Sequence, residues 1–208
     1  LKFRGAGHID YWFVSHTDSD HINGLAEILK SGYRIDYLVF AKGMPEDDKS
    51  MMLENLAISN KTKVIYIGRR EKIAYKNTVL KCVYPNEKET GDDKNEASMV
   101  IELSCGSFKA LFTGDAGKEA EEKMAGELSD IDLLKCGHHG SKYSSSEEFL
   151  KITKPEAVII SAGEDNSYGH PDIEALERIY GVCNNVYCTK DVGLIRVIYK
   201  NGKMLISD

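Results

Sequence analysis

The sequence predicts a layered α/β protein with mixed parallel and antiparallel sheets. Short runs rich in β-branched and aromatic residues alternate with stretches of helical periodicity along almost the whole chain. Residues 98–104 and 107–113 both have a strand pattern and are separated only by Cys105-Gly106, which predicts a hairpin. Strands joined by helices favour parallel pairing and a hairpin adds antiparallel pairing, so we expect helices to cover mixed sheets.

The first half of the chain contains four strand patterns and two helix patterns. Helices are predicted at residues 21–30, after the polar loop that follows the first strand, and at 45–59, where Pro45 suits the first helical turn. Residues 86–95 are charged and turn-forming, which predicts a loop. The strand patterns are the apolar runs IDYWFVS at 9–15, DYLVF at 36–40, KVIYI at 63–67 and TVLKCV at 78–83.

After the hairpin, strands and helices alternate regularly to the end of the chain. The predicted helices are residues 117–128, 146–153 and 172–180. The predicted strands are residues 131–135, 157–161, 186–188 and 194–199. We find no internal repeat and no low-complexity segment, and 208 residues suit one domain, so residues 1–208 are assigned to a single domain.

Composition excludes several classes of protein. No apolar run approaches the roughly 20 residues that span a bilayer, and residues 1–10 lack the apolar segment of a signal peptide. The five cysteines are scattered and form no CxxC pair, which favours free thiols over a disulfide framework or a cysteine zinc ribbon. The net charge of -6 argues against an extended nucleic-acid groove, although bound metal ions would add positive charge that composition does not count.

One short loop is unusually rich in potential metal ligands. His16, Asp18, Asp20 and His21 lie in SHTDSDHINGL, directly after the first predicted strand. The alternative is that Asp18 or Asp20 only caps the following helix. A cap explains one aspartate, whereas two acids and two imidazoles within six residues indicate a metal site.

Further candidate ligands follow other predicted strands. Asp115 ends LFTGD, His138 and His139 follow DLLKCG, and His170 follows VIISAGEDNSYG. Each has an ordinary alternative, since Asp115 could be a turn acid, HHGSKYSS a helix start capped by a serine, and His170 a loop residue. Five of the six histidines fall in these motifs, however. Because ligands at several strand ends share one sheet edge, the motifs together predict a two-metal site.

The order of these motifs resembles the metallo-β-lactamase superfamily, and most closely the C-terminal metallo-hydrolase domain of ComEC-type DNA-uptake competence proteins. The matching stretches cover nearly the whole chain: IDYWFVSHTDSDHINGL, NEASMVIEL, ALFTGD, DLLKCGHHGSKYSSSEEFL, KPEAVIISAGEDNSYGHP and TKDVGLIRV. The resemblance implies a four-layer αββα sandwich. Family members begin with strands that this chain lacks, so we expect the chain to be a fragment, or the missing strands to be supplied in another way.

The resemblance also implies a role for each candidate residue. His16 and Asp18 would bind one metal together with a histidine of the HHGS pair, Asp20, His21 and His170 would bind the second, and Asp115 would bridge them. Two features depart from the superfamily pattern. Asp18 replaces a histidine, so Mn²⁺ or Fe²⁺ competes better with Zn²⁺, and Asn95 and Ser98 stand where a further histidine is usual.

Catalytic roles are assigned to Asp20, His138 and His139. Of His138 and His139, one is expected to bind metal and the other either to support a ligand or to donate a proton to the leaving oxygen, with the choice left open. A second set of residues is assigned to the substrate, although the serines could equally cap the following helix. This set comprises Ser141, Lys142, Ser144, Ser145, Asn166 and Tyr168.

The expected function is hydrolysis by water activated by two divalent ions, Zn²⁺ or Mn²⁺. The absence of a GxSxG motif agrees with a mechanism that uses no serine nucleophile. The preferred substrate is a phosphodiester, in single- or double-stranded DNA taken up during competence. The alternatives are a small ester, lactone, thioester or phosphoester, and a metal-binding module without turnover. We expect a soluble domain, either cytoplasmic or part of a membrane competence protein, and the oligomeric state stays open.

Overall fold

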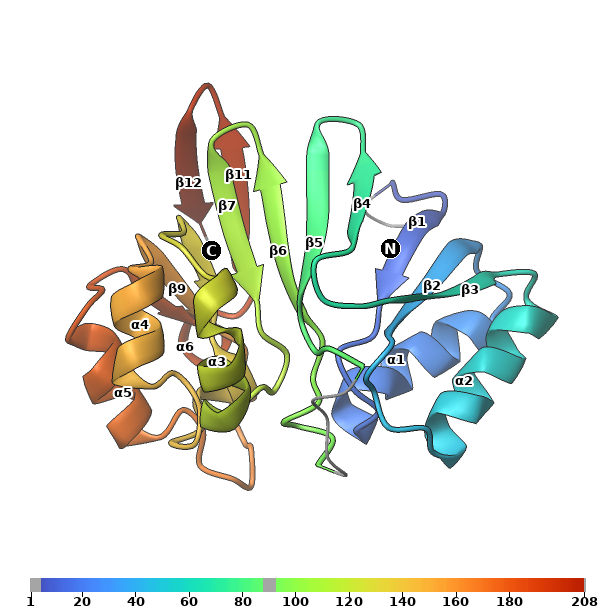
Figure 1. Cartoon of the computed structure of the whole chain (residues 1–208), viewed down its shortest axis with the longest axis horizontal. Helices are drawn as coiled ribbons and strands as arrows, with labels where there is room; N and C mark the ends of the chain where they lie inside the picture. Colours follow the sequence, from blue (N-terminus) through green and yellow to red (C-terminus); the bar gives the residue numbers. More distant parts are fainter. Residues whose placement is uncertain (1–4, 88–92, 208) are drawn as a thin grey trace.

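Two sheets face each other, and each carries helices on its outer side (Figure 1). The computed structural model describes residues 5–87 and 93–207. Helices α1 and α2 cover one sheet, and α3, α4 and α5 cover the other. The chain is therefore a four-layer αββα sandwich, as the resemblance implies.

The smaller sheet contains three parallel strands in the order β1-β2-β3. They are β1 (Ile9–Phe13), β2 (Ile35–Ala41) and β3 (Lys63–Ile67), connected by α1 (Ser19–Lys30) and α2 (Asp48–Ser59). In α1 the buried residues Ile22, Leu25, Ala26 and Leu29 recur at helical spacing. This stripe packs against Leu38 and Phe40 of β2 and holds the helix to the sheet.

The larger sheet is mixed. Its seven strands lie in the order β10-β9-β8-β7-β6-β5-β4, antiparallel from β4 to β7 and parallel from β7 to β10. The strands are β4 (Lys72–Tyr75), β5 (Thr78–Tyr84), β6 (Val100–Cys105), β7 (Phe108–Phe112), β8 (Leu133–Lys135), β9 (Ala157–Ile160) and β10 (Val186–Cys188). The predicted hairpin is confirmed as β6–β7.

Helices and a separate hairpin cover the larger sheet. The helices α3 (Lys118–Met124), α4 (Glu147–Thr153) and α5 (Ile173–Tyr180) enclose a core that includes Leu111, Leu134 and Ile160. Short helical segments are η2 (Ala125–Glu127), η3 (Gly137–Gly140) and α6 (Thr189–Val192). The hairpin of β11 (Arg196–Lys200) and β12 (Lys203–Ser207) packs on Phe108 and Leu133.

Most element bounds agree with the prediction to within a few residues, and the differences have local causes. The predicted helix 45–59 begins at Asp48 because Asp47 and Ser50 form a reciprocal capping box. The predicted helix 117–128 gives way after Met124 to the 3₁₀ turn η2. Strands β4 and β12 and the short helix α6 were not predicted, since each is short. Of the predicted loop 86–95, residues 88–92 lie outside the described residues.

A third core joins the two sheets. Val39 and Ala41 of β2 and Ile67 of β3 pack against Cys82 of β5 and Ile101 of β6. All five cysteines are free thiols, as predicted. Within residues 5–87 and 93–207, no helix combines the length and apolar character needed to cross a bilayer.

Candidate metal centre

The candidate ligands come from loops that follow strands of both sheets. His16 and His21 follow β1 of the smaller sheet, whereas Asp115 follows β7 and the HHGS pair follows β8 of the larger sheet. Parallel strands end at the same edge, so their loops meet there. The structure thus brings together segments that are far apart in sequence.

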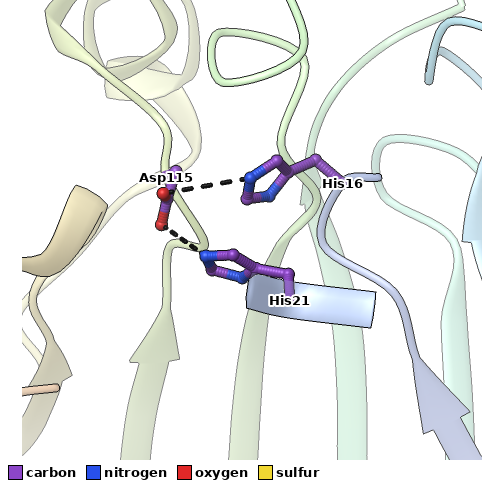
Figure 2. A group of neighbouring side chains, drawn as sticks. All are labelled: His16, His21 and Asp115. Atoms are coloured by element: carbon purple, nitrogen blue, oxygen red, sulfur yellow. Dashed lines mark ion pairs between the residues drawn. The ribbon is translucent and has the colours of Figure 1, made fainter. Parts of the chain in front are cut away.

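Asp115 lies between two histidines (Figure 2). Its Oδ2 is 3.9 Å from His16 Nε2, and its Oδ1 is 3.4 Å from His21 Nε2. His16 is fully buried and Asp115 is only 4% exposed. Each carboxylate oxygen thus faces a different imidazole, an arrangement that suits a carboxylate shared by two ions.

His139 approaches the same group from the larger sheet. Its Nε2 lies 3.1 Å from His21 Nε2, 3.3 Å from Asp20 Oδ2 and 3.4 Å from Asp115 Oδ2. Asp20, His21 and His139 therefore offer three ligand atoms around one point. This places His139 with Asp20 and His21, a position for which the resemblance implies His170.

Asp18, His138 and His170 surround this centre at longer distances. Asp18 Oδ2 lies 3.7 Å from His16 Nε2, and His138 Nε2 lies 3.9 Å from Asp115 Oδ2. The His170 ring centroid is 5.9 Å from that of His138. The eight predicted ligands thus lie in loops, in η3 and in the first turn of α1, with His170 beside His138.

The Asp18 side chain does not cap helix α1. Asp18 occupies the N-cap position of α1, but its side chain makes no capping hydrogen bond. Its carboxylate instead faces His16. Asp18 is therefore available as a ligand.

Hydrogen bonds orient the imidazoles through their Nδ1 atoms. Ser15 Oγ lies 3.2 Å from Nδ1 of both His16 and His21, and Ser98 Oγ lies 3.3 Å from Nδ1 of His16. His139 Nδ1 donates to the carbonyl oxygen of Ser161 at 2.7 Å. With Nδ1 engaged, Nε2 of each ring points to the centre, as in histidines that bind metals.

Backbone geometry brings the loops unusually close. Gly114 has φ +55°, and a Cβ there would lie 2.8 Å from Ser15 Cβ. Gly140 has φ +82°, and a Cβ there would lie 2.7 Å from Pro171 Cβ. His138 and His139 also have positive φ values, 47° and 54°. Left-handed backbone at non-glycine residues is typical of functional sites.

The ionisation states suit metal ligands. Burial, together with the neighbouring His21, lowers the pKa of His16 to about 4, so its imidazole is neutral at pH 7. Burial tends to raise the pKa of Asp115, but the adjacent His139 and His21 outweigh it and keep the pKa well below its usual range. Divalent ions bind neutral imidazole and ionised carboxylate, which are the forms of His16 and Asp115.

Three buried atoms of candidate ligands have no hydrogen-bond partner within the described residues. They are His16 Nε2, Asp115 Oδ1 and His170 Nδ1, and the first two face the centre. A buried polar atom without a partner costs free energy that a bound metal ion would recover. The donor set of imidazoles and carboxylates therefore fits divalent metal ions.

The predicted substrate residues separate into two groups. Ser144 and Ser145 are fully buried and bond to Gly137 O and Cys136 Sγ, respectively, within the HHGS region. Ser141 is also buried, and Ser141 Oγ accepts from Tyr143 N. These serines stabilise the loop, and the cap of α4 is supplied by Ser146.

The remaining predicted substrate residues lie nearer the surface. Asn166 Oδ1 accepts from His170 N and Asn166 Nδ2 donates to His170 O, so Asn166 holds the His170 loop. Tyr168 is 83% exposed and stacks on His170, with ring centroids 5.9 Å apart. Lys142 Nζ lies 5.4 Å from the ring of Tyr143. Tyr168 thus lies beside the candidate centre, whereas the contact described for Lys142 is with Tyr143.

Sequence reasoning missed Lys135 and Ser15. Lys135 is the last residue of β8, and its Nζ is buried without a hydrogen-bond partner among the described residues. The signal was a charged residue at the end of an apolar strand just before HHGS. Ser15 gave no comparable signal, because serine is common at strand ends.

Residues 86–164 match the family described as the metallo-beta-lactamase superfamily. Two solved structures show the same fold across most of the chain. One is CmlA, a diiron β-hydroxylase from Streptomyces venezuelae, at 15% identity and a TM-score of 0.59, covering 88% of this chain and 44% of CmlA. The other is YhfI, a metallo-β-lactamase fold protein from Bacillus subtilis, at 14% identity and a TM-score of 0.54, covering 99% of this chain and 82% of YhfI.

Residues 86–164 thus resemble the metallo-β-lactamase superfamily in sequence, and the chain as a whole shares the metallo-β-lactamase fold. The chain is also similar to curated competence proteins. It is 32% identical to ComE operon protein 3 of Bacillus subtilis over 97% of this chain and 26% of that protein. It is 28% identical to Recombination protein 2 of Haemophilus influenzae over 93% of this chain and 23% of that protein. The chain thus spans about a quarter of the length of these relatives.

Proposed function

We propose that this chain hydrolyses phosphodiester bonds in DNA with the help of two divalent metal ions. The observation that carries the proposal is the convergence of His16, His21 and Asp115 with Asp20 and His139. Relatives named for competence and recombination support DNA as the substrate. We further propose that the chain is the hydrolase part of a larger competence protein.

The ligands divide between two positions that share Asp115. His16 and Asp18 would hold one ion, Asp20, His21 and His139 would hold the other, and Asp115 would contact both. His170 would complete the shell on the side of His138. Bound there, the ions would lower the pKa of a water molecule and bind the oxygens of the phosphoryl group.

His138 is the stronger candidate for proton donor. His139 is anchored through Nδ1 to Ser161 and directs Nε2 at Asp20 and His21, which suits a ligand. His138 has no such anchor among the described contacts, and 27% of its side chain is exposed. It would donate a proton to the leaving oxygen of the cleaved bond.

The test combines metal analysis with assays on three substrates. The purified chain loaded with Mn²⁺ or Zn²⁺ should bind two ions and hydrolyse bis-p-nitrophenyl phosphate and single-stranded DNA. If the protein hydrolyses a carboxylic ester or a lactone but no phosphodiester, the proposed substrate class is wrong and the substrate is an ester or lactone. Stoichiometric metal binding without turnover of any substrate would indicate a binding module.

One observation favours a smaller, less charged substrate as a second candidate. An open cleft of about 400 Å³ lies beside His21, and its wall includes Leu80, Met99, Ile101 and Phe112. Apolar side chains suit the acyl group of an ester or lactone. The net charge of -6 also suits a small substrate better than a long polyanion.

A further inference from the structure

A lysine side chain lines the cleft beside the candidate metal centre. Lys135 lines the cleft together with His21, Ser15 and Gly114. Its side chain as a whole is partly exposed, but its Nζ is inaccessible to solvent. Within residues 5–87 and 93–207, this Nζ has no hydrogen-bond partner.

An unpaired buried ammonium is expensive. Burying an ion without a partner costs several kcal/mol even after relaxation. Burial accordingly lowers the pKa of Lys135, and the Asp115 carboxylate opposes this effect without forming an ion pair with it. Leu103 and Phe112, which line the same cleft, offer no side-chain acceptor. A charged Lys135 therefore destabilises the fold unless a bound anion pairs with it.

The charges of the centre point to the same conclusion. Asp18, Asp20 and Asp115 carry three negative charges in total. Two divalent ions carry four positive charges, so the centre with both ions bound has an excess of one positive charge. A protonated Lys135 adds one further positive charge to this excess. A phosphodiester would reduce the excess, whereas a neutral ester or lactone would leave it unchanged.

We propose that Lys135 is a substrate-binding residue whose ammonium donates to a non-bridging phosphate oxygen, and that it thereby selects phosphodiesters over neutral esters. The inference rests on the proposed metal-dependent hydrolysis and names the substrate class of the same site. Two bound metal ions would hold the phosphoryl group from one side, and the Lys135 side chain, which lines the cleft, would turn its buried Nζ toward the bound phosphate. A charged donor in a place sheltered from water binds more strongly than an exposed one.

The test compares Lys135→Met with wild type and with Lys118→Met, which removes an exposed lysine. Methionine keeps the length of the side chain and removes the charge. In Mn²⁺-loaded protein, KM for bis-p-nitrophenyl phosphate should rise by about 10- to 100-fold, the loss of one charged hydrogen bond. Hydrolysis of p-nitrophenyl acetate should stay within about twofold. Lys118→Met should change neither, and Lys135→Arg should recover part of the phosphodiester activity.

A binding measurement separates this inference from the proposed function. Dimethyl phosphate is an anionic phosphodiester that should raise the Tm of the Mn²⁺-loaded wild type, and neutral trimethyl phosphate should not. Lys135→Met should lose this shift, and its metal-free Tm should equal or exceed that of wild type because an unpaired charge has been removed.

Three results would overturn the inference. They are an unchanged dimethyl phosphate shift in Lys135→Met, an equal loss of activity on both substrates, and a fall in metal-free Tm for Lys135→Met and Lys135→Gln alike. If the wild type shows no phosphodiester turnover, the proposed function is refuted but the role of Lys135 is not. That role would still be decided by the change in Tm on adding dimethyl phosphate.

Discussion

Individual side chains set the chemistry of this site through their protonation and orientation. His16 is buried and neutral, and its Nε2 is directed at Asp115. Asp115 is buried and ionised, with one oxygen toward each of two histidines. These states suit divalent ions before any metal arrives, so little reorganisation is needed on binding.

Replacing the shared carboxylate tests the two-metal arrangement at the residue scale. Asp115→Asn keeps the shape of the side chain but removes the charge that both ions would share. We expect metal content to fall from two ions to less than one, and hydrolysis to fall to background. Elemental analysis and initial rates measure both effects. Asp130→Asn, at an exposed carboxylate, is the matched control, and full activity in Asp115→Asn would exclude the bridging role.

Ser98 tests the orientation of His16. Ser98 Oγ accepts from the backbone N–H of Asp115 at 3.1 Å and lies 3.3 Å from His16 Nδ1. Ser98→Ala should weaken metal affinity by about 10- to 100-fold, as is usual when the support of a ligand is removed. Competition with a fluorescent chelator measures the affinity. Ser107→Ala, remote and exposed, should leave it unchanged, and an equal loss in both variants would point to a general folding defect.

At the scale of elements, the first ligand loop is anchored to helix α2. Thr17, which lies between His16 and Asp18, donates a hydrogen bond to Asp47 Oδ2 at 2.8 Å. Asp47 also caps α2 through Ser50 and pairs with Lys94. Although burial opposes it, hydrogen bonds from Lys94, Ser50 and Thr17 lower the pKa of Asp47 to about 2. The Asp47 carboxylate thus links the start of α2 to the first ligand loop.

Asp47→Ala should therefore destabilise the fold in a pH-dependent way. Loss of the cap should lower the free energy of unfolding by about 1 kcal/mol at pH 7. Because the folded pKa is depressed, this contribution is complete above the unfolded pKa near 4 and disappears as pH falls through about 2. Urea unfolding at several pH values measures it. A difference from wild type that stays constant down to pH 2 would contradict the assignment.

Several elements were predictable because their pattern is local. The strand and helix around the first motif follow from IDYWFVS and from apolar residues at helical spacing, and both were confirmed. Strands β4 and β12, with the sequences KIAY and KMLIS, were missed because each has a polar end and only three apolar residues, which is a weak pattern. Their pairing partners, β5 and β11, define them as strands.

At the scale of the whole molecule, the metal centre joins the two halves of the sandwich. His16, Asp18, Asp20 and His21 belong to the half with the smaller sheet, whereas Asp115 and His139 belong to the half with the larger sheet. A bound ion would connect the two halves in addition to the core between the sheets. Metal binding should thus stabilise the whole fold.

Removing the metal should lower the melting temperature of the entire chain in one transition. At a free metal concentration about 100 times Kd, the stabilisation is about 2.7 kcal/mol. Differential scanning calorimetry with EDTA and with added Mn²⁺ measures the shift. Asp115→Asn should show a much smaller shift, and a wild-type Tm independent of metal would argue against a centre that spans both sheets.

The sequence by itself determined the layered α/β class, and it supplied the candidate ligand residues and the resemblance to the metallo-β-lactamase superfamily, because these depend on local periodicity and on motifs of fixed spacing. Only the tertiary structure decided which groups meet. His21 and His139 are 118 positions apart, yet their Nε2 atoms lie 3.1 Å from each other. Likewise, nothing in DLLKCG shows that Lys135 Nζ is buried beside the cleft without a partner. Such distances depend on how two sheets pack and on where their loops end, which no local pattern encodes.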